Sequence, residues 1–157
     1  MKNRSTDSPI FPSPNSDALK PDLFQGIYKG KRVLVTGHTG FKGSWLTLWL
    51  HKLSADVTGL ALAPNTKPNH FDLIGLNALI HNIEGDIRDA QTVQAAFAVV
   101  QPEIVFHLAA QAIVRQSYFE PVETFSSNVM GTVNVLEAAR ACESVRVARF
   151  PRRGDSR

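Results

Sequence analysis

The chain has 157 residues, a length that suits one domain and is short for two. Hydrophobic residues make up 43% and charged residues 20%, which excludes collagen, coiled coil and wholesale disorder. There is no apolar run of about 18 residues and no apolar stretch near the start, so we expect neither a membrane span nor a secretory signal. The single cysteine, Cys142, permits no internal disulfide and indicates a reducing, cytoplasmic location.

The net charge of +3 is concentrated at one end of the chain. Residues 1–139 hold 11 Lys/Arg and 12 Asp/Glu, a net −1, whereas residues 140–157 hold six arginines and two acids, a net +4. No basic face runs through the fold, so we expect no nucleic-acid partner. The composition predicts a Pro/Ser-rich disordered leader over residues 1–23, a folded domain over 24–147 and an arginine-rich tail over 148–157.

Apolar strands and amphipathic helices alternate from residue 32 onward. Strands are predicted over 32–36, 56–62, 78–83, 104–108 and from 145, and helices over 41–53, 90–100 and 122–142. A loop or a short helix separates the second strand from the third. Because parallel strands need right-handed helical crossovers, this order predicts a doubly wound parallel α/β sheet of Rossmann type, truncated after about the fifth strand.

Three glycines, Gly37, Gly40 and Gly43, lie between the first strand and the first helix. The first can adopt the positive φ of a tight turn, the second lets backbone approach a pyrophosphate, and the third lets the helix pack near the strand. The helix N-terminus adds unpaired N–H groups and the positive end of its dipole. Their spacing is G-x-x-G-x-x-G instead of the commoner G-x-G-x-x-G, and their position favours a dinucleotide site over a structural turn.

The end of the second strand lacks the acidic residue that usually binds the adenosine ribose, because residues 60–63 are all Leu or Ala. No arginine is there to accept a 2′-phosphate either, which gives NAD only a slight preference over NADP. Asp86 follows the third strand and has two roles open to it. It can accept a hydrogen bond from an adenine amino group, or it can be a turn or cap residue.

With these residues in place, the chain resembles the CDP-glucose 4,6-dehydratases of the extended short-chain dehydrogenase/reductase superfamily. The resemblance covers residues 24–147 and rests on the glycine-turn segment 37–45 and on segments 64–71, 85–89, 106–111, 114–118 and 128–132. By this resemblance, Thr39, Phe41 and Lys42 line the pyrophosphate turn with the three glycines, and Asp86 and Ile87 flank adenine. Leu108, Ala109 and Gln111 border the nicotinamide, and Asn128 braces the helix beneath it. Arg115, Ser117 and Tyr118 are expected on a loop at the carboxyl edge of the sheet.

The resemblance implies bound NAD and a nucleotide-sugar substrate, CDP-glucose, with a homodimer in the complete protein. In the implied reaction, NAD takes a hydride from C4 of the sugar, water is lost across C5–C6, and the hydride returns to C6. The alternatives are a non-catalytic dinucleotide-binding module, a relative that acts on UDP-sugars as an epimerase or dehydratase, and an arginine-tailed interaction fragment.

The superfamily's catalytic Tyr-x-x-x-Lys pair is absent from the 157 residues. Arg32 stands four positions after Tyr28, and Val122 stands four positions after Tyr118. We therefore expect no catalytic residue and no dehydratase turnover from this chain alone, and we interpret the tail as the product of a truncation or a shifted reading frame. The histidines lack metal-ligand spacing, so no metal site is expected. Trp45, Trp49 and His107 are predicted to be core residues.

Overall fold

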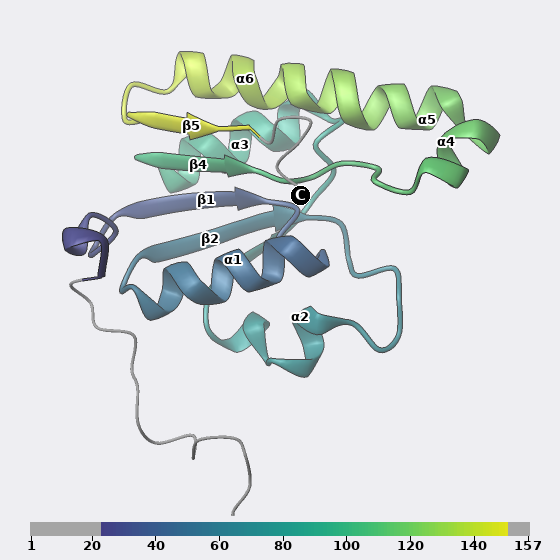
Figure 1. The fold of residues 1–157 in the computed structure, drawn as a ribbon. Coiled ribbons are helices and arrows are strands. Elements are labelled where there is room, and N and C mark those ends of the chain that lie inside the picture. Colours follow the sequence, from purple (N-terminus) through teal and green to yellow (C-terminus); the bar gives the residue numbers. More distant parts are fainter. Residues whose placement is uncertain (1–22, 151–157) are drawn as a thin grey trace, which may run out of the picture.

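The computed structural model describes residues 23–150, and it contains one five-stranded sheet with helices on both faces (Figure 1). The strands are β1 (Arg32–Thr36), β2 (Asp56–Ala61), β3 (His81–Glu84), β4 (Ile104–His107) and β5 (Val147–Arg149). The α-helices are α1 (Phe41–Lys52), α2 (His70–Leu73), α3 (Ala90–Val100), α4 (Val114–Phe119), α5 (Pro121–Phe125) and α6 (Gly131–Ala141). Short 3-10 turns span Leu23–Gly26 and Leu76–Ala78, and a π-type turn spans Ser126–Met130. The predicted leader, apart from Leu23, and the tail from residue 151 lie outside the described residues.

All neighbouring strands are parallel, and their order is β3-β2-β1-β4-β5. This confirms the predicted doubly wound sheet. The chain builds from β1 towards one edge and then returns to the other side of β1 with β4. The carboxyl ends of β1 and β4 therefore flank the topological switch point, where ligands bind in folds of this kind.

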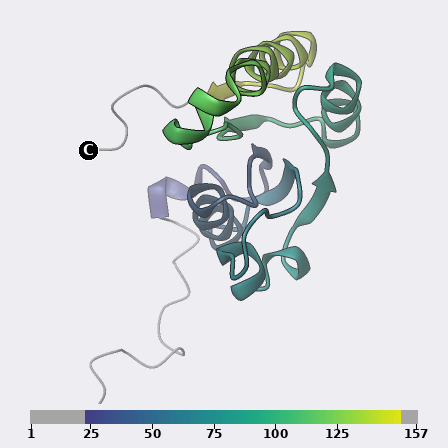
Figure 2. The same ribbon diagram turned by 90° about the vertical axis from the view of Figure 1, so that its right-hand side faces the viewer.

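The two faces of the sheet are covered by different helices, α1 on one face and α3 with α6 on the other (Figure 1 and Figure 2). Side chains alternate along β1: Leu34 packs into the cluster beneath α3 and α6, while Val33 and Val35 pack with Leu50 of α1. All three β1 residues are fully buried. A strand buried on both faces reads as a continuous apolar run in the sequence, which is why β1 was predictable.

The prediction that Trp45 and Trp49 belong to the core is wrong. Their exposed fractions are 52% and 48%, because α1 turns the small or short residues Gly43, Ser44 and Thr47 towards the sheet along with Leu50. Trp45 instead stacks on the ring of His70 with centroids 4.4 Å apart. A helix that is apolar around most of its circumference does not show from sequence alone which side faces the sheet.

Several element boundaries differ from the prediction by one to three residues; β5, for example, begins at Val147 instead of residue 145. The third strand begins at His81 instead of residue 78, because Gly75 adopts a left-handed conformation and starts a 3-10 turn at the buried Leu76. Residues 115–118 form the short helix α4, so the expectation of a loop there is wrong. The predicted helix over 122–142 is present as α5, the π-type turn and α6 in succession.

Among residues 23–150, none of the helices combines the length and the apolar character needed to cross a membrane. The same residues contain no group of three or more His, Cys, Asp or Glu side chains that could hold a metal ion.

Candidate functional site

The glycine turn after β1 lies directly against the loop after β4. Gly37 has a φ of 76°, and a Cβ atom there would lie 2.6 Å from the backbone nitrogen of Ala109. A Cβ atom on Gly43 would lie 2.0 Å from the carbonyl oxygen of Gly37. Both contacts are shorter than real Cβ contacts, so only glycine permits this turn to close and α1 to start beneath it.

The amino end of α1 presents its backbone to the open side of this turn. Gly40 is the N-cap residue, and its extended backbone offers no side-chain cap to the first N–H groups of the helix. A Cβ on Gly40 would meet only the Gly37 carbonyl oxygen, at the ordinary distance of 3.4 Å, so its outer side is open. Phe41 and Lys42 follow and are exposed. Uncapped N–H groups at the positive end of a helix dipole form a site suited to an anion.

A cavity of about 210 Å³ opens beside this turn, at the carboxyl ends of β2 and β3. Thr39 closes one side, where its Oγ1 donates a hydrogen bond of 2.9 Å to the carbonyl oxygen of Leu62. Asp72 and Glu84 are among the residues that line it, and none of the described residues around it is a lysine or arginine. Much of the remaining wall is apolar, from Ala61, Leu62, Ala63, Pro64 and Phe71, and the charged residues of the cavity are both acidic.

His38 lies beneath the cavity and was missed as part of the site by sequence reasoning. It is fully buried, and its Nε2 is 2.7 Å from Oδ1 of Asn82, a residue that lines the cavity. Among the described residues, no group lies within good hydrogen-bond geometry of its Nδ1, although the Leu60 backbone is close enough to act on the ring. Burial lowers the pKa of the His38 imidazole, so the ring is neutral near pH 7. The sequence held one signal for the buried position of His38, the glycine in the middle of β2, since a glycine inside a strand often marks the close approach of another group. A Cβ at Gly59 would lie 2.2 Å from the His38 ring.

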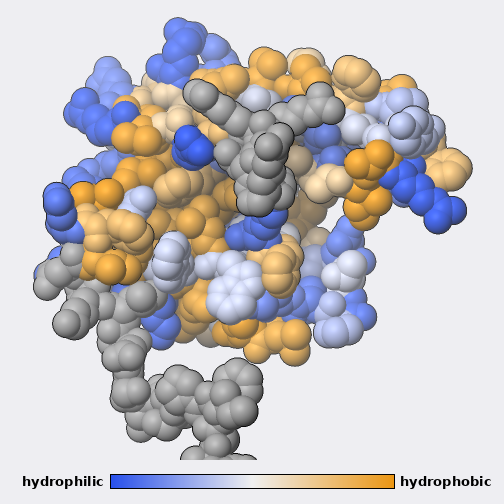
Figure 3. Space-filling view, in the orientation of Figure 1, coloured by the Kyte–Doolittle hydropathy of each residue, from blue (hydrophilic) through white to orange (hydrophobic). Residues whose placement is uncertain are grey.

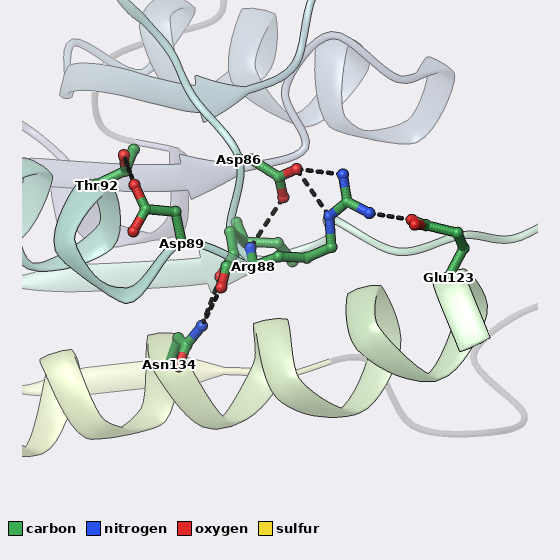
Figure 4. Close-up of polar contacts among 7 residues, drawn as sticks. Asp86, Arg88, Asp89, Thr92, Glu123 and Asn134 are labelled. Carbon is green, nitrogen blue, oxygen red and sulfur yellow. Dashed lines mark hydrogen bonds and ion pairs between the residues drawn. The ribbon is translucent and has the colours of Figure 1, made fainter.

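The loop after β3 holds Asp86 and Ile87, the two residues expected near adenine. The Asp86 carboxylate accepts hydrogen bonds from the Arg88 backbone N–H at 2.9 Å and from Arg88 Nε at 2.7 Å (Figure 4). These bonds hold the pKa of Asp86 below its usual value. Ile87 is buried against Gly131 of α6. The sequence analysis did not single out Arg88 as a site residue. The one signal for it in the sequence is its position two residues after Asp86.

Asn128, in the π-type turn Ser126–Met130 between α5 and α6, anchors the loop after β4. Its Oδ1 accepts from the Gln111 backbone N–H at 2.7 Å, and its Nδ2 donates to the Gln111 carbonyl oxygen at 3.0 Å. The Leu108 N–H bonds to the Thr36 carbonyl oxygen at 3.0 Å. Both ends of this loop are therefore fixed, one to β1 and the other to the helix.

His107 is a hydrogen-bonded core residue, as predicted. Thr132 Oγ1 donates to the Asn128 carbonyl oxygen, so it accepts from His107 Nε2 at 3.0 Å, and Nδ1 then accepts from Thr36 Oγ1 at 2.7 Å. This assignment of the tautomer follows from the donors available. Burial lowers the pKa of His107 to about 4.

The structure thus brings the glycine turn into contact with Ala109 and brings Gln111 to Asn128, while Asp86 and Ile87 lie on the neighbouring loop after β3. The glycine turn and the start of α1, which has no side-chain cap, lie at the switch point of a parallel sheet. This arrangement places the chain among the Rossmann-type α/β folds that bind dinucleotides as a class.

The sequence model of the GDP-mannose 4,6 dehydratase family matches residues 34–153, and the chain belongs to this family. The CDP-glucose 4,6-dehydratase of Salmonella typhimurium is 50% identical over 122 residues, which cover 78% of this chain and 34% of that protein. The UDP-glucuronate 4-epimerase 1 of Arabidopsis thaliana is 40% identical over 117 residues, covering 71% of this chain and 27% of that protein. The chain thus spans between about a quarter and a third of the length of these curated relatives.

Solved structures show the same fold. The UDP-glucose 4-epimerase of Thermotoga maritima, solved with UDP-glucose, superposes with a TM-score of 0.65 at 31% identity, covering 74% of this chain and 36% of that one. The UDP-glucose 4-epimerase of Thermus thermophilus, solved in complex with NAD, superposes with a TM-score of 0.62 at 33% identity, covering 73% and 35%.

Proposed function

We propose that this chain binds NAD across the carboxyl ends of β1, β3 and β4. The pyrophosphate would lie on the N–H groups at the start of α1, within the segment Gly37 to Gly43. Adenine would lie beside Asp86 and Ile87, and the nicotinamide would lie towards Leu108, Ala109 and Gln111, with Asn128 holding that loop. The observation that carries the proposal is the close contact of the glycine turn with Ala109, which leaves an uncapped helix end open at the switch point.

The charge of the cavity beside Thr39 favours NAD over NADP. A ribose 2′-hydroxyl can donate a hydrogen bond to a carboxylate, whereas a 2′-phosphate would be repelled by the carboxylates of Asp72 and Glu84. Glu84 would thus take the place of the acid that is missing from the end of β2. The relative from Thermus thermophilus carries NAD in its structure, which supports the same choice.

For the complete protein we propose conversion of a nucleotide sugar, CDP-glucose, to its 4-keto-6-deoxy product. The 50% identity to the Salmonella enzyme supports this substrate, and the epimerase relatives make a UDP-sugar the second candidate. Bound NAD would supply the hydride acceptor and donor. This chain carries no Tyr-x-x-x-Lys pair, so we expect no turnover from it alone; release of a 4-keto sugar from CDP-glucose would contradict that expectation.

We also propose that the complete protein forms a homodimer through the surface of α5 and α6. We propose further that it acts in the cytosol. Apolar side chains reach the surface along α5 and α6 (Figure 3), among them Val122, Phe125, Val133 and Leu136. Surfaces of this kind mark protein–protein interfaces. A single free cysteine suits a reducing compartment.

Calorimetric titration with NAD tests the proposed cofactor site. Gly40→Ala places a methyl group where the phosphates would lie without straining the backbone, so we expect affinity to fall by at least about tenfold at an unchanged melting temperature. Gly30→Ala is the matched control, because Gly30 has a φ of 68° at the opposite end of β1 with nothing within 4 Å of its Cβ position. It should lower the melting temperature and leave affinity unchanged. Absence of saturable binding, or equal affinity in Gly40→Ala, would refute the proposal.

A further inference from the structure

Among residues 23–150, Arg88 is the side chain that holds the carboxylate of Asp86 (Figure 4). Three Arg88 nitrogens reach it: the backbone N–H at 2.9 Å from Oδ1, Nε at 2.7 Å from Oδ2, and Nη2 at 2.6 Å from Oδ2. The remaining terminal nitrogen, Nη1, pairs with the carboxylate of Glu123 on α5. The guanidinium therefore lies between two carboxylates, one on the loop and the other on the helix.

The backbone of the same loop is fastened to α6. Asn134 Nδ2 donates to the carbonyl oxygens of Ile87 at 2.9 Å and of Arg88 at 3.0 Å. The side chain of Ile87 fills the space beside Gly131, where a Cβ would lie 2.5 Å from Ile87 Cδ1. These contacts hold the backbone of the loop without the Arg88 side chain. The Arg88 side chain therefore acts on the rotamer of Asp86 and not on the position of the loop.

The number of hydrogen bonds on Asp86 matters for what it can still bind. An ionised carboxylate offers about four acceptor positions; Arg88 donates two hydrogen bonds to it, from the backbone N–H and from Nε, and its Nη2 forms an ion pair with Oδ2. The carboxylate also stays partly open, with 26% of its side-chain surface exposed. The hydrogen bonds from Arg88 lower the pKa of Asp86, which keeps it in the form that only accepts. Arg88 reaches Oδ1 only through its backbone N–H, so an acceptor position on that oxygen of a fixed, ionised and accessible carboxylate remains for a ligand.

We infer that Arg88 is a positioning residue for adenine recognition: it fixes the Asp86 carboxylate so that its free acceptor position receives the 6-amino group of an adenine nucleotide. This inference rests on the proposed NAD site. It adds that the preference for adenine over other purines depends on the Arg88 guanidinium. Because this guanidinium also pairs with Glu123, the preference depends on the position of α5 as well. Nε and Nη2 of Arg88 both face Oδ2, and two nitrogens of one rigid planar group fix the direction of that oxygen better than a single ammonium group does.

The competing explanation is that Arg88 only ties the loop to α5. In that case its removal would weaken every dinucleotide to the same extent. NAD and nicotinamide hypoxanthine dinucleotide separate the two explanations, because they differ at position 6 of the purine, where an oxygen replaces the amino group. The ratio of their affinities reports the hydrogen bond to Asp86 and cancels a general loosening of the loop.

The experiment measures both affinities by calorimetry for the full chain and for three variants. We expect the unsubstituted chain to prefer NAD by about tenfold, the effect of one hydrogen bond to a charged group. Arg88→Ala should reduce this preference to within about threefold, and Arg88→Lys, which keeps the charge opposite Glu123 but not the planar group, should give an intermediate value. Arg140→Ala is the matched control, since Arg140 pairs with Glu137 on the exposed face of α6, and it should keep the full preference.

The outcomes are distinguishable. A preference that stays the same or rises in Arg88→Ala would overturn the inference, and Arg88→Lys gives the same comparison if Arg88→Ala does not fold. Equal binding of the two dinucleotides by the unsubstituted chain would also overturn it, while leaving the NAD site in place. Binding of neither dinucleotide would overturn the proposed function and this inference with it.

Discussion

Acidification should destabilise this fold mainly through His107. Its pKa is 6.5 in the unfolded chain and about 4 in the folded protein, because burial disfavours the charged ring. Between these values the unfolded state binds more protons, so stability is complete above pH 6.5 and is lost as the pH falls towards 4. At about 1.36 kcal/mol per pKa unit the full effect is about 3 kcal/mol, of which about 2 kcal/mol falls between pH 7 and pH 4.5. Burial also lowers the pKa of His38, which adds a loss of the same sign.

Urea unfolding at pH 7 and pH 4.5 measures this difference. His107→Gln removes the titrating ring and should reduce the loss of stability on acidification by about 2 kcal/mol, although it also lowers stability at pH 7. His81→Gln, which replaces an exposed histidine on the edge strand β3, is the matched control and should keep the full loss. A pH 4.5 limit stays above the range where the Asp86 carboxylate protonates, since its pKa is lowered. An unchanged loss in His107→Gln would refute the reasoning.

Four further substitutions, two of them combined in one chain, test the packing around the site. Gly43→Ala should cost at least about 3 kcal/mol in thermal unfolding, or prevent folding, because its Cβ would lie 2.0 Å from the Gly37 carbonyl oxygen; a cost below about 1 kcal/mol would contradict the turn geometry. Gly59→Ala should lower the free energy of unfolding by about 2 kcal/mol, because its Cβ would meet the His38 ring. Adding His38→Ala to the same chain should recover part of that loss. Additive effects in the double variant would show that the two positions do not touch. Asn128→Ala should cost about 1–2 kcal/mol in urea unfolding, because it removes two hydrogen bonds to the backbone of the loop after β4; no change would count against that anchor.

Much of the fold was predictable from local sequence. The apolar run of β1 and the cap at Asp89 each reflect interactions within a few residues, and the structure bears out both, with Asp89 accepting from the Gln91 N–H. The glycine turn was recognisable from its local spacing, although Gly37 also meets Ala109, which lies far along the chain. The parallel, doubly wound sheet followed from the alternation of elements and the handedness of crossovers, whereas the strand order β3-β2-β1-β4-β5 came from the structure. The boundaries of the third strand and the helix over 114–119 were less predictable, since a 3-10 turn and a short helix leave little periodic signal.

By itself, then, the sequence determined the class of fold, the place of the glycine turn and the buried role of His107. Only the tertiary structure decided which side of α1 faces the sheet, how His38 fits beside Gly59, and that Arg88 joins Asp86 to Glu123. The physical reason is the separation of the partners. Periodicity and turn chemistry depend on near neighbours in the chain, whereas these contacts join residues up to 35 positions apart that meet only after the sheet has assembled.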